Sequence, residues 1–148
     1  MPQSSVLPLI MICLGGAAVA LRAPINAALS RAIQSPVAAA AVSFGVGFAI
    51  LLGLSLLTGG TGPMARLATV PFWQMAGGLL GAFYVWSMIS GVAGLGVVTA
   101  IAAMIFGQLV AALLLDQVGA FGIVAQPISL TRVAAIVLVA AGLILSRF

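Results

Sequence analysis

The chain has 148 residues, of which 64% are apolar and only 4% are charged, and its mean hydropathy is +1.39. Soluble domains carry roughly 25% charged residues, so this composition excludes an ordinary water-soluble domain. With one acidic residue and no histidine, a single chain cannot build the carboxylate pairs, His-centred triads or His/Cys clusters of enzymes and metal sites. We therefore expect no catalytic residues, no metal and no cofactor.

Five arginines and one aspartate give the chain a net charge of +4. The arginines are spread singly along the chain and form no basic patch, so we expect no nucleic-acid partner. A helix that spans a bilayer needs about 20 apolar residues, and five such spans fit into this length with short connections. The sequence thus predicts an all-α, polytopic membrane protein with five transmembrane helices in a single domain over residues 1–148.

The first two expected spans cover residues 6–28 and 35–57. Pro24 lies near the far end of the first span, and we predict that the helix is interrupted there because proline removes a backbone hydrogen bond. The second span has a clear start. Ser35 can cap free N–H groups, and Pro36 suits the first helical position, where its missing donor costs nothing.

The other three expected spans cover residues 71–90, 97–116 and 129–146. A short glycine-rich turn separates the third span from the fourth. An irregular loop follows the fourth span, and either Ser129 or Thr131 caps the last helix. With five spans, the two termini are expected on opposite sides of the membrane.

Small residues recur four positions apart on three of the expected helices. Lipid provides little hydrophobic force between helices, so they associate where small residues let their backbones approach. Three consecutive helices with this spacing favour a tight bundle. The residues concerned are Ala39, Ser43 and Gly47, then Gly77 and Gly81, and finally Ala103, Gly107 and Ala111.

Arginine counts in the loops set no clear orientation. Arg66 and Arg132 are expected on the N-terminal side, and Arg31 and Arg147 on the other, with Arg22 extending its side chain towards that second side. An excess of basic residues normally retains one side in the cytoplasm, so a bias this small predicts that the chain inserts in both orientations. Alternatively, Arg22 and Arg31 together hold their side in the cytoplasm.

Insertion in both orientations would allow an antiparallel dimer of two five-helix chains. Such a dimer is the two-chain equivalent of the inverted repeats that underlie alternating access in many transporters, where the substrate binds near the membrane midplane. The expected partners are therefore the lipid bilayer, a second copy of this chain or a related five-helix chain, and a small-molecule substrate that the sequence does not identify.

Several short motifs occur in an order that resembles the YdcZ-type five-helix family of the drug/metabolite transporter superfamily. They cover nearly the whole chain: residues 24–29, 35–36, 40–47, Trp73 with 77–82, 107–109, 115–116 with Gly119 and Gly122, and 129–132 with Gly142. The resemblance implies a bacterial-type inner-membrane protein related to antiparallel homodimers, heterodimers and fused ten-helix chains. It implies no substrate. Arg22 is a departure, because an uncharged polar residue such as Gln is expected there.

Polar side chains at membrane depth are the candidates for a substrate path, because they are costly there and usually face a cavity. Arg22, Asn26 and Ser30 follow one another at intervals of four, which aligns them on one face of a continuous helix. Arg22 could bind an anionic or carbonyl group, and Asn26 could donate and accept hydrogen bonds. Alternatively, Arg22 reaches lipid phosphates and Asn26 bonds backbone groups freed by the proline.

Three further residues are weaker candidates for the substrate path. Gln108 is expected near the membrane midplane, where its amide needs a partner that is either another helix or a ligand. Tyr84 and Trp86 could form the wall of a pocket, although aromatic residues at such positions are usually packing or interface residues.

Asp116 is the only carboxylate, so any proton or ion coupling through a carboxylate must use it. It lies at the C-terminal end of the fourth expected helix, where the helix dipole disfavours a negative charge. We therefore favour a pair between Asp116 and Arg132, or a cap on the following turn, over a proton relay.

The sequence thus predicts a transporter of a small metabolite or drug-like solute that works by alternating access, most simply as an antiparallel dimer. Two alternatives stay open. One is a channel for a small anion, because a lone arginine with Asn and Ser can line a narrow pore. The other is a membrane assembly subunit that transports nothing.

Overall fold

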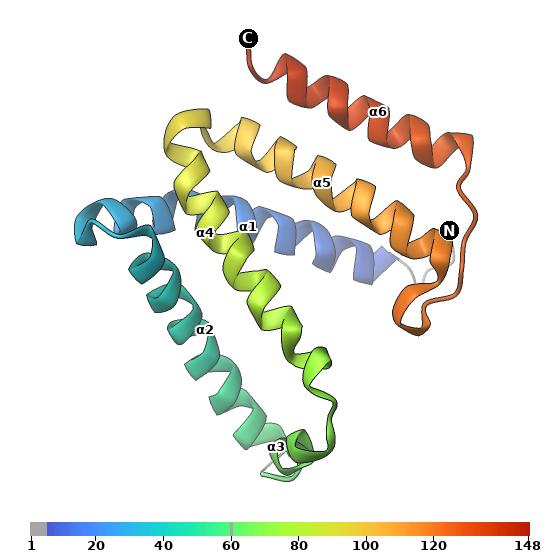
Figure 1. Ribbon diagram of the computed structural model, residues 1–148. Coiled ribbons are helices and arrows are strands. Elements are labelled where there is room, and N and C mark those ends of the chain that lie inside the picture. The colour runs from blue at the N-terminus through green and yellow to red at the C-terminus, as the bar shows by residue number, and fades with distance from the viewer. Residues whose placement is uncertain (1–5, 60) are drawn as a thin grey trace. The chain divides into compact units, whose positions relative to one another are not determined.

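The computed structural model describes residues 6–59 and 61–148, and every regular element in these two ranges is a helix. Contacts within the chain divide it into two compact units, Met1–Ala93 and Gly94–Phe148. Figure 1 shows the helices of both units. Each unit is described by itself. The all-helical, polytopic fold class predicted from the sequence is confirmed.

The first unit begins with two long helices, α1 (Val6–Ile33) and α2 (Pro36–Gly59), which a tight turn joins into a hairpin. The Ser35 hydroxyl accepts a hydrogen bond from the backbone N–H of Ala38 at 3.2 Å. The prediction that Ser35 caps the second helix and Pro36 begins it is therefore confirmed.

The predicted interruption at Pro24 is wrong, because α1 continues without a break from Val6 to Ile33 with Pro24 inside it. A proline in a helix removes the hydrogen bond to the carbonyl four residues earlier. Membrane helices tolerate this loss where neighbouring groups satisfy the freed carbonyl. The first helix consequently runs beyond residue 28, the expected end of the span.

Two short helices, α3 (Gly62–Ala65) and η2 (Arg66–Thr69), fill the connection after α2. The third expected span is a short 3₁₀ helix, η3 (Phe72–Ala76), continued by α4 (Gly77–Leu95). This span ends later than residue 90, because α4 passes through two glycines that membrane helices tolerate. It stops before Gly96, whose φ of +77° does not fit a helix.

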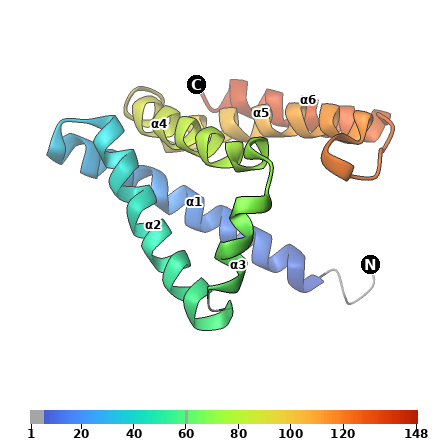
Figure 2. The same ribbon diagram turned by 60° about the horizontal axis from the view of Figure 1, so that its bottom comes forward.

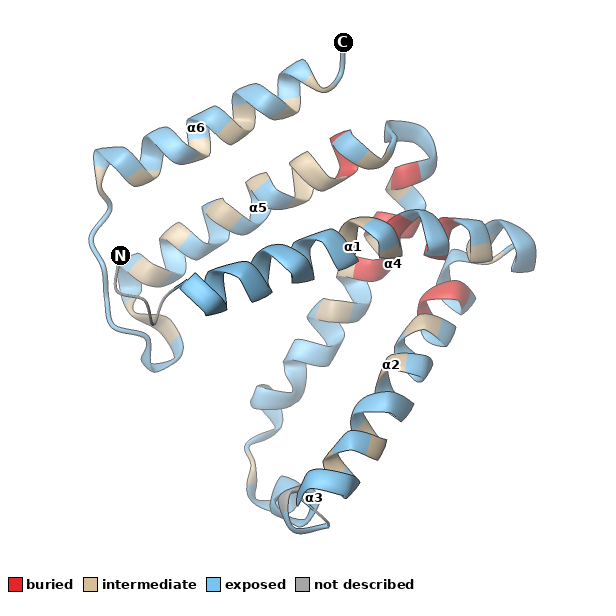
Figure 3. Ribbon diagram, turned by 180° about the vertical axis from the view of Figure 1, so that it is seen from behind, coloured by how far each residue is buried: buried red, intermediate tan, exposed pale blue. Residues whose placement is uncertain are grey.

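The buried residues of the first unit gather where α1, α2 and α4 approach one another (Figure 3). Ala39 and Ala40 of α2 pack there with Val85 and Ile89 of α4, and Leu29 of α1 lies against them. The alanines let α2 come close to its neighbours, as small residues do in membrane bundles.

The second unit is a pair of helices, α5 (Val97–Val118) and α6 (Leu130–Leu145), which lie side by side in Figures 1 and 2. Gly119 ends α5 in the left-handed conformation, with φ at +62°, and the one-turn 3₁₀ helix η4 (Ala120–Gly122) follows. Ser129 accepts a hydrogen bond from the N–H of Arg132 at 3.3 Å. Of the two capping residues considered, Ser129 is therefore the one that caps α6.

Among the described residues, four helical segments are long and apolar enough to cross a membrane: Val6–Ile33, Pro36–Gly59, Phe72–Leu95 and Val97–Val118. The last helix, α6, has 16 residues, or about 24 Å, which is shorter than the roughly 30 Å of a bilayer's hydrocarbon core. A fifth crossing would need the extended residues before α6 as well. The five-span topology and the single domain stay predictions.

Candidate functional site

Arg22 lies deep within the first membrane-spanning helix. It stands within three residues of the middle of α1 and 11 residues before Ile33, which is about 16 Å from the end of the helix. Because α1 continues to Ile33, this arginine lies further from the end of the helix than it would if the helix ended near Pro24. A charge at this depth is costly unless neighbouring groups compensate for it.

The Arg22 side chain contacts two residues of α2. Its Nε lies 3.4 Å from the Ser43 hydroxyl oxygen, to which it donates a long hydrogen bond. The guanidinium carbon lies 5.3 Å from the centre of the Phe44 ring, which is the geometry of a cation–π contact. Both partners are uncharged, and Ser43 is the eighth residue of α2, about 10 Å into that helix. The charge therefore remains within the apolar part of the hairpin.

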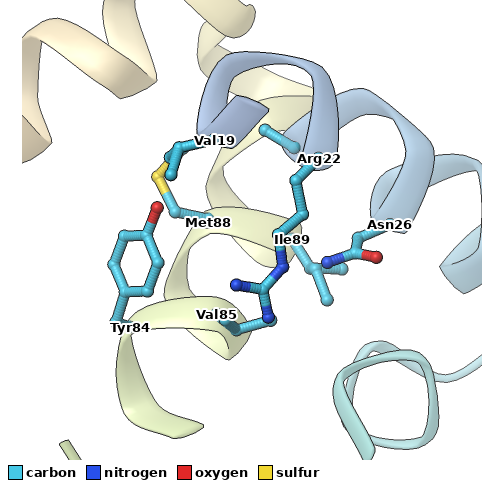
Figure 4. Close-up of a pocket in the computed structure, with 8 residues that line it drawn as sticks. Val19, Arg22, Asn26, Tyr84, Val85, Met88 and Ile89 are labelled. Atoms are coloured by element: carbon cyan, nitrogen blue, oxygen red, sulfur yellow. The ribbon is translucent and has the colours of Figure 1, made fainter. Parts of the chain in front are cut away.

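Arg22 also lines a small cavity between α1 and α4. Figure 4 shows Arg22 and Asn26 on the α1 side, facing Val85 and Ile89 of α4, with Tyr84 one residue before Val85. The cavity has a volume of about 10 Å³, which is room for about one water molecule. The cavity between α1 and α4 is therefore too small for a larger solute.

Asn26 is the most buried polar side chain among the described residues of the first unit, with a relative exposure of 6%. Within residues 6–59 and 61–148, its amide makes no hydrogen bond. Burying an amide in an apolar environment without a hydrogen-bond partner costs on the order of several kcal/mol. Asn26 is thus an amide available to a ligand or a water in the small cavity.

The structure brings three of the predicted path residues, Arg22, Asn26 and Tyr84, to the same cavity. Trp86 lies on another side of α4, where it lines an apolar groove, and its ring centre lies 6.2 Å from that of Phe83. Gln108 belongs to the second unit and is exposed there, in the middle of α5. Their roles in a substrate path stay predictions.

Ser30 does not line that cavity, although it lies two turns after Arg22 on α1. It is half-buried, and its carbonyl oxygen accepts a hydrogen bond from the backbone N–H of Ser35 at 3.2 Å. Its backbone therefore helps to close the turn between α1 and α2.

Asp116 pairs with Arg132 across the second unit. A carboxylate oxygen of Asp116 accepts a hydrogen bond from Nη2 of Arg132, in a salt bridge between the end of α5 and the start of α6. The favoured prediction, a pair between these two residues, is confirmed. The backbone carbonyl of Asp116 also accepts a hydrogen bond from the N–H of Gln126 at 2.8 Å. The alternative role in proton or ion coupling stays a prediction.

The predicted packing residues differ in what surrounds them. Ser43 bonds Arg22, and a side-chain carbon at Gly81 would lie 3.4 Å from the Phe44 ring. At Gly47, Gly77 and Gly107, such a carbon would meet no atom within 4 Å in the described part of the chain. Close packing at these three glycines stays a prediction.

Sequence reasoning assigned Ser43 to helix packing and gave no role to Phe44, yet these two residues hold the guanidinium of Arg22. One signal could have indicated them. The connection between α1 and α2 is only two residues long, Gln34 and Ser35, so the helices form an antiparallel hairpin. Residues of α2 at a similar distance from the turn as Arg22 are then its natural neighbours.

Apolar helices of spanning length, joined by short turns, define a polytopic membrane protein, and polar groups within its spans are typical of proteins that move solutes. The profile of one family, described as "putative inner membrane exporter, YdcZ", matches residues 7–145. The chain therefore belongs to the YdcZ family, which is a family of membrane transporters and not of enzymes. Comparisons with curated proteins and with solved structures give no match.

Proposed function

We propose that the chain exports a small metabolite or drug-like solute by alternating access, as an antiparallel dimer. One observation carries this proposal: Arg22 and Asn26, which lie within the membrane-spanning helix α1, line a cavity between α1 and α4. Polar groups at such a depth usually mark a solute pathway. The cavity has room for about one water, so a larger solute could enter it only if α1 and α4 moved apart, as alternating access requires.

The antiparallel arrangement is supported by the balance of the loop arginines. Because α1 is continuous, Arg22 belongs to the span and not to a loop. With five spans, Arg66 and Arg132 then lie on one side of the membrane, and Arg31 and Arg147 lie on the other. Each side therefore has two loop arginines. An even balance removes the bias that normally fixes orientation, so both insertions are expected. The partner in the dimer is a second copy or a related five-helix chain.

Orientation is tested with a chain whose only two cysteines replace Gly62 and Phe148, with Cys13 changed to Ala. Intact cells are treated with an impermeant thiol reagent that adds a large mass. Insertion in both orientations with five spans predicts that every labelled molecule carries one tag, with about half of the molecules labelled at each site. Molecules with two tags or none would show four spans, and labelling at one site alone would contradict the antiparallel homodimer.

Alternating access is tested with Asn26→Cys in the chain that lacks Cys13. If the cavity of each molecule stayed open to one side of the membrane only, labelling by an external reagent would level off at about half of the molecules. Alternating access predicts that labelling continues slowly to all of them. Complete labelling at the rate of the exposed Gly62→Cys site would favour the small-anion channel. No labelling at all would favour an assembly subunit.

A further inference from the structure

We infer that the transported solute is an organic anion whose charged group binds Arg22 and whose apolar part lies along α2; this inference rests on the proposed function. The unit Met1–Ala93 contains no acidic side chain, because the only acidic residue of the chain is Asp116. Asp116 is itself engaged by Arg132 in the other unit. A second copy of the chain would likewise bring no spare acidic side chain.

Within residues 6–59 and 61–148, the contacts of Arg22 leave its charge without a counter-ion. Ser43 accepts one hydrogen bond from Nε, and Phe44 offers the face of its ring. A guanidinium has five N–H donors in a planar fork, and in the described ranges only Nε has a hydrogen-bond partner. A planar oxyanion such as a carboxylate fits this fork through two parallel hydrogen bonds.

The space beside Arg22 is suited to an amphipathic molecule. Arg22 lines a groove of about 500 Å³ that runs along α2, a volume within the usual range of small-molecule sites. Its two polar residues, Arg22 and Ser43, lie next to each other, and the other lining residues are apolar. These are Phe44, Val46, Gly47, Phe48 and Leu51. The chemistry of the groove is thus one cationic group beside an apolar wall.

Gly47 leaves room for the apolar part of the solute. Ser43, Gly47 and Leu51 recur every four residues, so they share one face of α2. A side-chain carbon at Gly47 would meet no atom of the described residues within 4 Å. A larger residue there would therefore fit without disturbing the helix and would fill the groove below the arginine.

The test is a calorimetric melting experiment on the full chain in a lipid-free, non-ionic detergent. The probes are cyclohexanecarboxylate, cyclohexylmethanol and cyclohexylmethylammonium, which share one ring and differ in charge, together with acetate, which lacks the ring. At ten times its dissociation constant, a ligand of the folded state raises Tm by about 3 °C. We expect this shift from the ring carboxylate alone. An equal shift from the alcohol or the ammonium probe would overturn the inference.

Variants separate the charge from the apolar wall. Arg22→Gln should abolish the shift, Arg22→Lys should retain a weaker preference for the anion, and Arg31→Gln should behave as wild type. Gly47→Leu should remove the shift from cyclohexanecarboxylate, whereas Gly45→Leu, a matched change outside the groove with equal space around it, should not. A shift that survives both Arg22→Gln and Gly47→Leu would contradict the site.

The phosphate of a lipid head group has the same chemistry as a solute oxyanion, and a further arm distinguishes the two. Phosphatidylglycerol is added to the detergent before the probes. If it raises Tm in an Arg22-dependent way and abolishes the carboxylate shift, the counter-ion is a lipid and the inference fails. Binding is measured without any transport, so a chain that binds the anion but fails the Asn26→Cys test would contradict the proposed function alone.

Discussion

Arg22 and Arg132 are both partly buried arginines, but their surroundings differ. In the second unit, Arg132 is the third residue of α6 and Asp116 is the third from the end of α5. Each charge lies at the helix end that disfavours it, and the two compensate for each other. In the first unit, the partners of Arg22 among the described residues are only the Ser43 hydroxyl and the Phe44 ring. Arg132 thus has an acidic partner in the structure, whereas we propose that Arg22 finds its counter-charge in a ligand.

The largest effect is expected from Asp116→Asn, which removes the negative charge that compensates Arg132. Nη1 of Arg132 is already buried without a hydrogen-bond partner in the described ranges, and the change leaves this partly buried cation without a compensating charge. We expect the free energy of unfolding to fall by about 3 kcal/mol, measured by denaturant titration in detergent.

The double variant Asp116→Asn with Arg132→Gln is the control for this loss. It removes both charges from the helix ends that disfavour them, and should recover more than half of the lost stability. Losses that simply add would mean that the two side chains act independently, and the contrast with Arg22 would not hold.

A second difference lies in the connections between the helices. The α1–α2 turn has Gln34 at a φ of +54°, and the α5–α6 connection has Gly119 at +62°. A side-chain carbon at Gly119 would lie 3.1 Å from the carbonyl oxygen of Ile123. Gly119→Ala should therefore cost about 2 kcal/mol, from the left-handed backbone and this contact.

Gln34→Gly is the matched change in the first unit. It relieves the left-handed backbone but removes the hydrogen bond from Nε2 to the Arg31 carbonyl oxygen, so the net change should stay within about 0.5 kcal/mol. Equal effects in thermal unfolding at the two connections would show that the close contact at Gly119 does not matter.

Sequence reasoning predicted features that depend on local chemistry. The starts of α2 and α6 follow from Ser35 and Ser129, and the pair of Asp116 with Arg132 follows from opposite charges on either side of one loop. Features that depend on tertiary packing were missed. Membrane helices tolerate proline and glycine when neighbours satisfy the backbone, so neither Pro24 nor the glycines of α4 marked a helix end.

The candidate site was predicted in part for the same reason. The spacing of Arg22 and Asn26 placed them on one face of α1, which they share in the structure. Which residues of α2 and α4 meet that face depends on how each helix is rotated about its axis, and packing decides this rotation. The role of Ser43 as a hydrogen-bond acceptor therefore emerged only from the structure.

Ser43→Asp would give Arg22 the counter-ion that Arg132 already has. The new carboxylate would stand where the Ser43 hydroxyl lies, 3.4 Å from Nε. We expect the free energy of unfolding to rise by about 1.5 kcal/mol and the melting shift with cyclohexanecarboxylate to disappear. Ser43→Asn is the neutral control of the same shape. If Ser43→Asp still bound the anion as wild type does, Arg22 would not be the group that holds it.

The last prediction compares the two capping serines. Ser35 and Ser129 each accept one backbone hydrogen bond, at 3.2 and 3.3 Å, and replacing either by Ala should cost about 1 kcal/mol. The donor to Ser129 is the N–H of Arg132 itself, so this cap also holds the arginine in position for Asp116. Ser129→Ala should therefore cost less in the Asp116→Asn background, whereas the cost of Ser35→Ala should be unchanged there, as a double-mutant cycle would measure. Equal coupling for both serines would mean that the cap and the ion pair are independent.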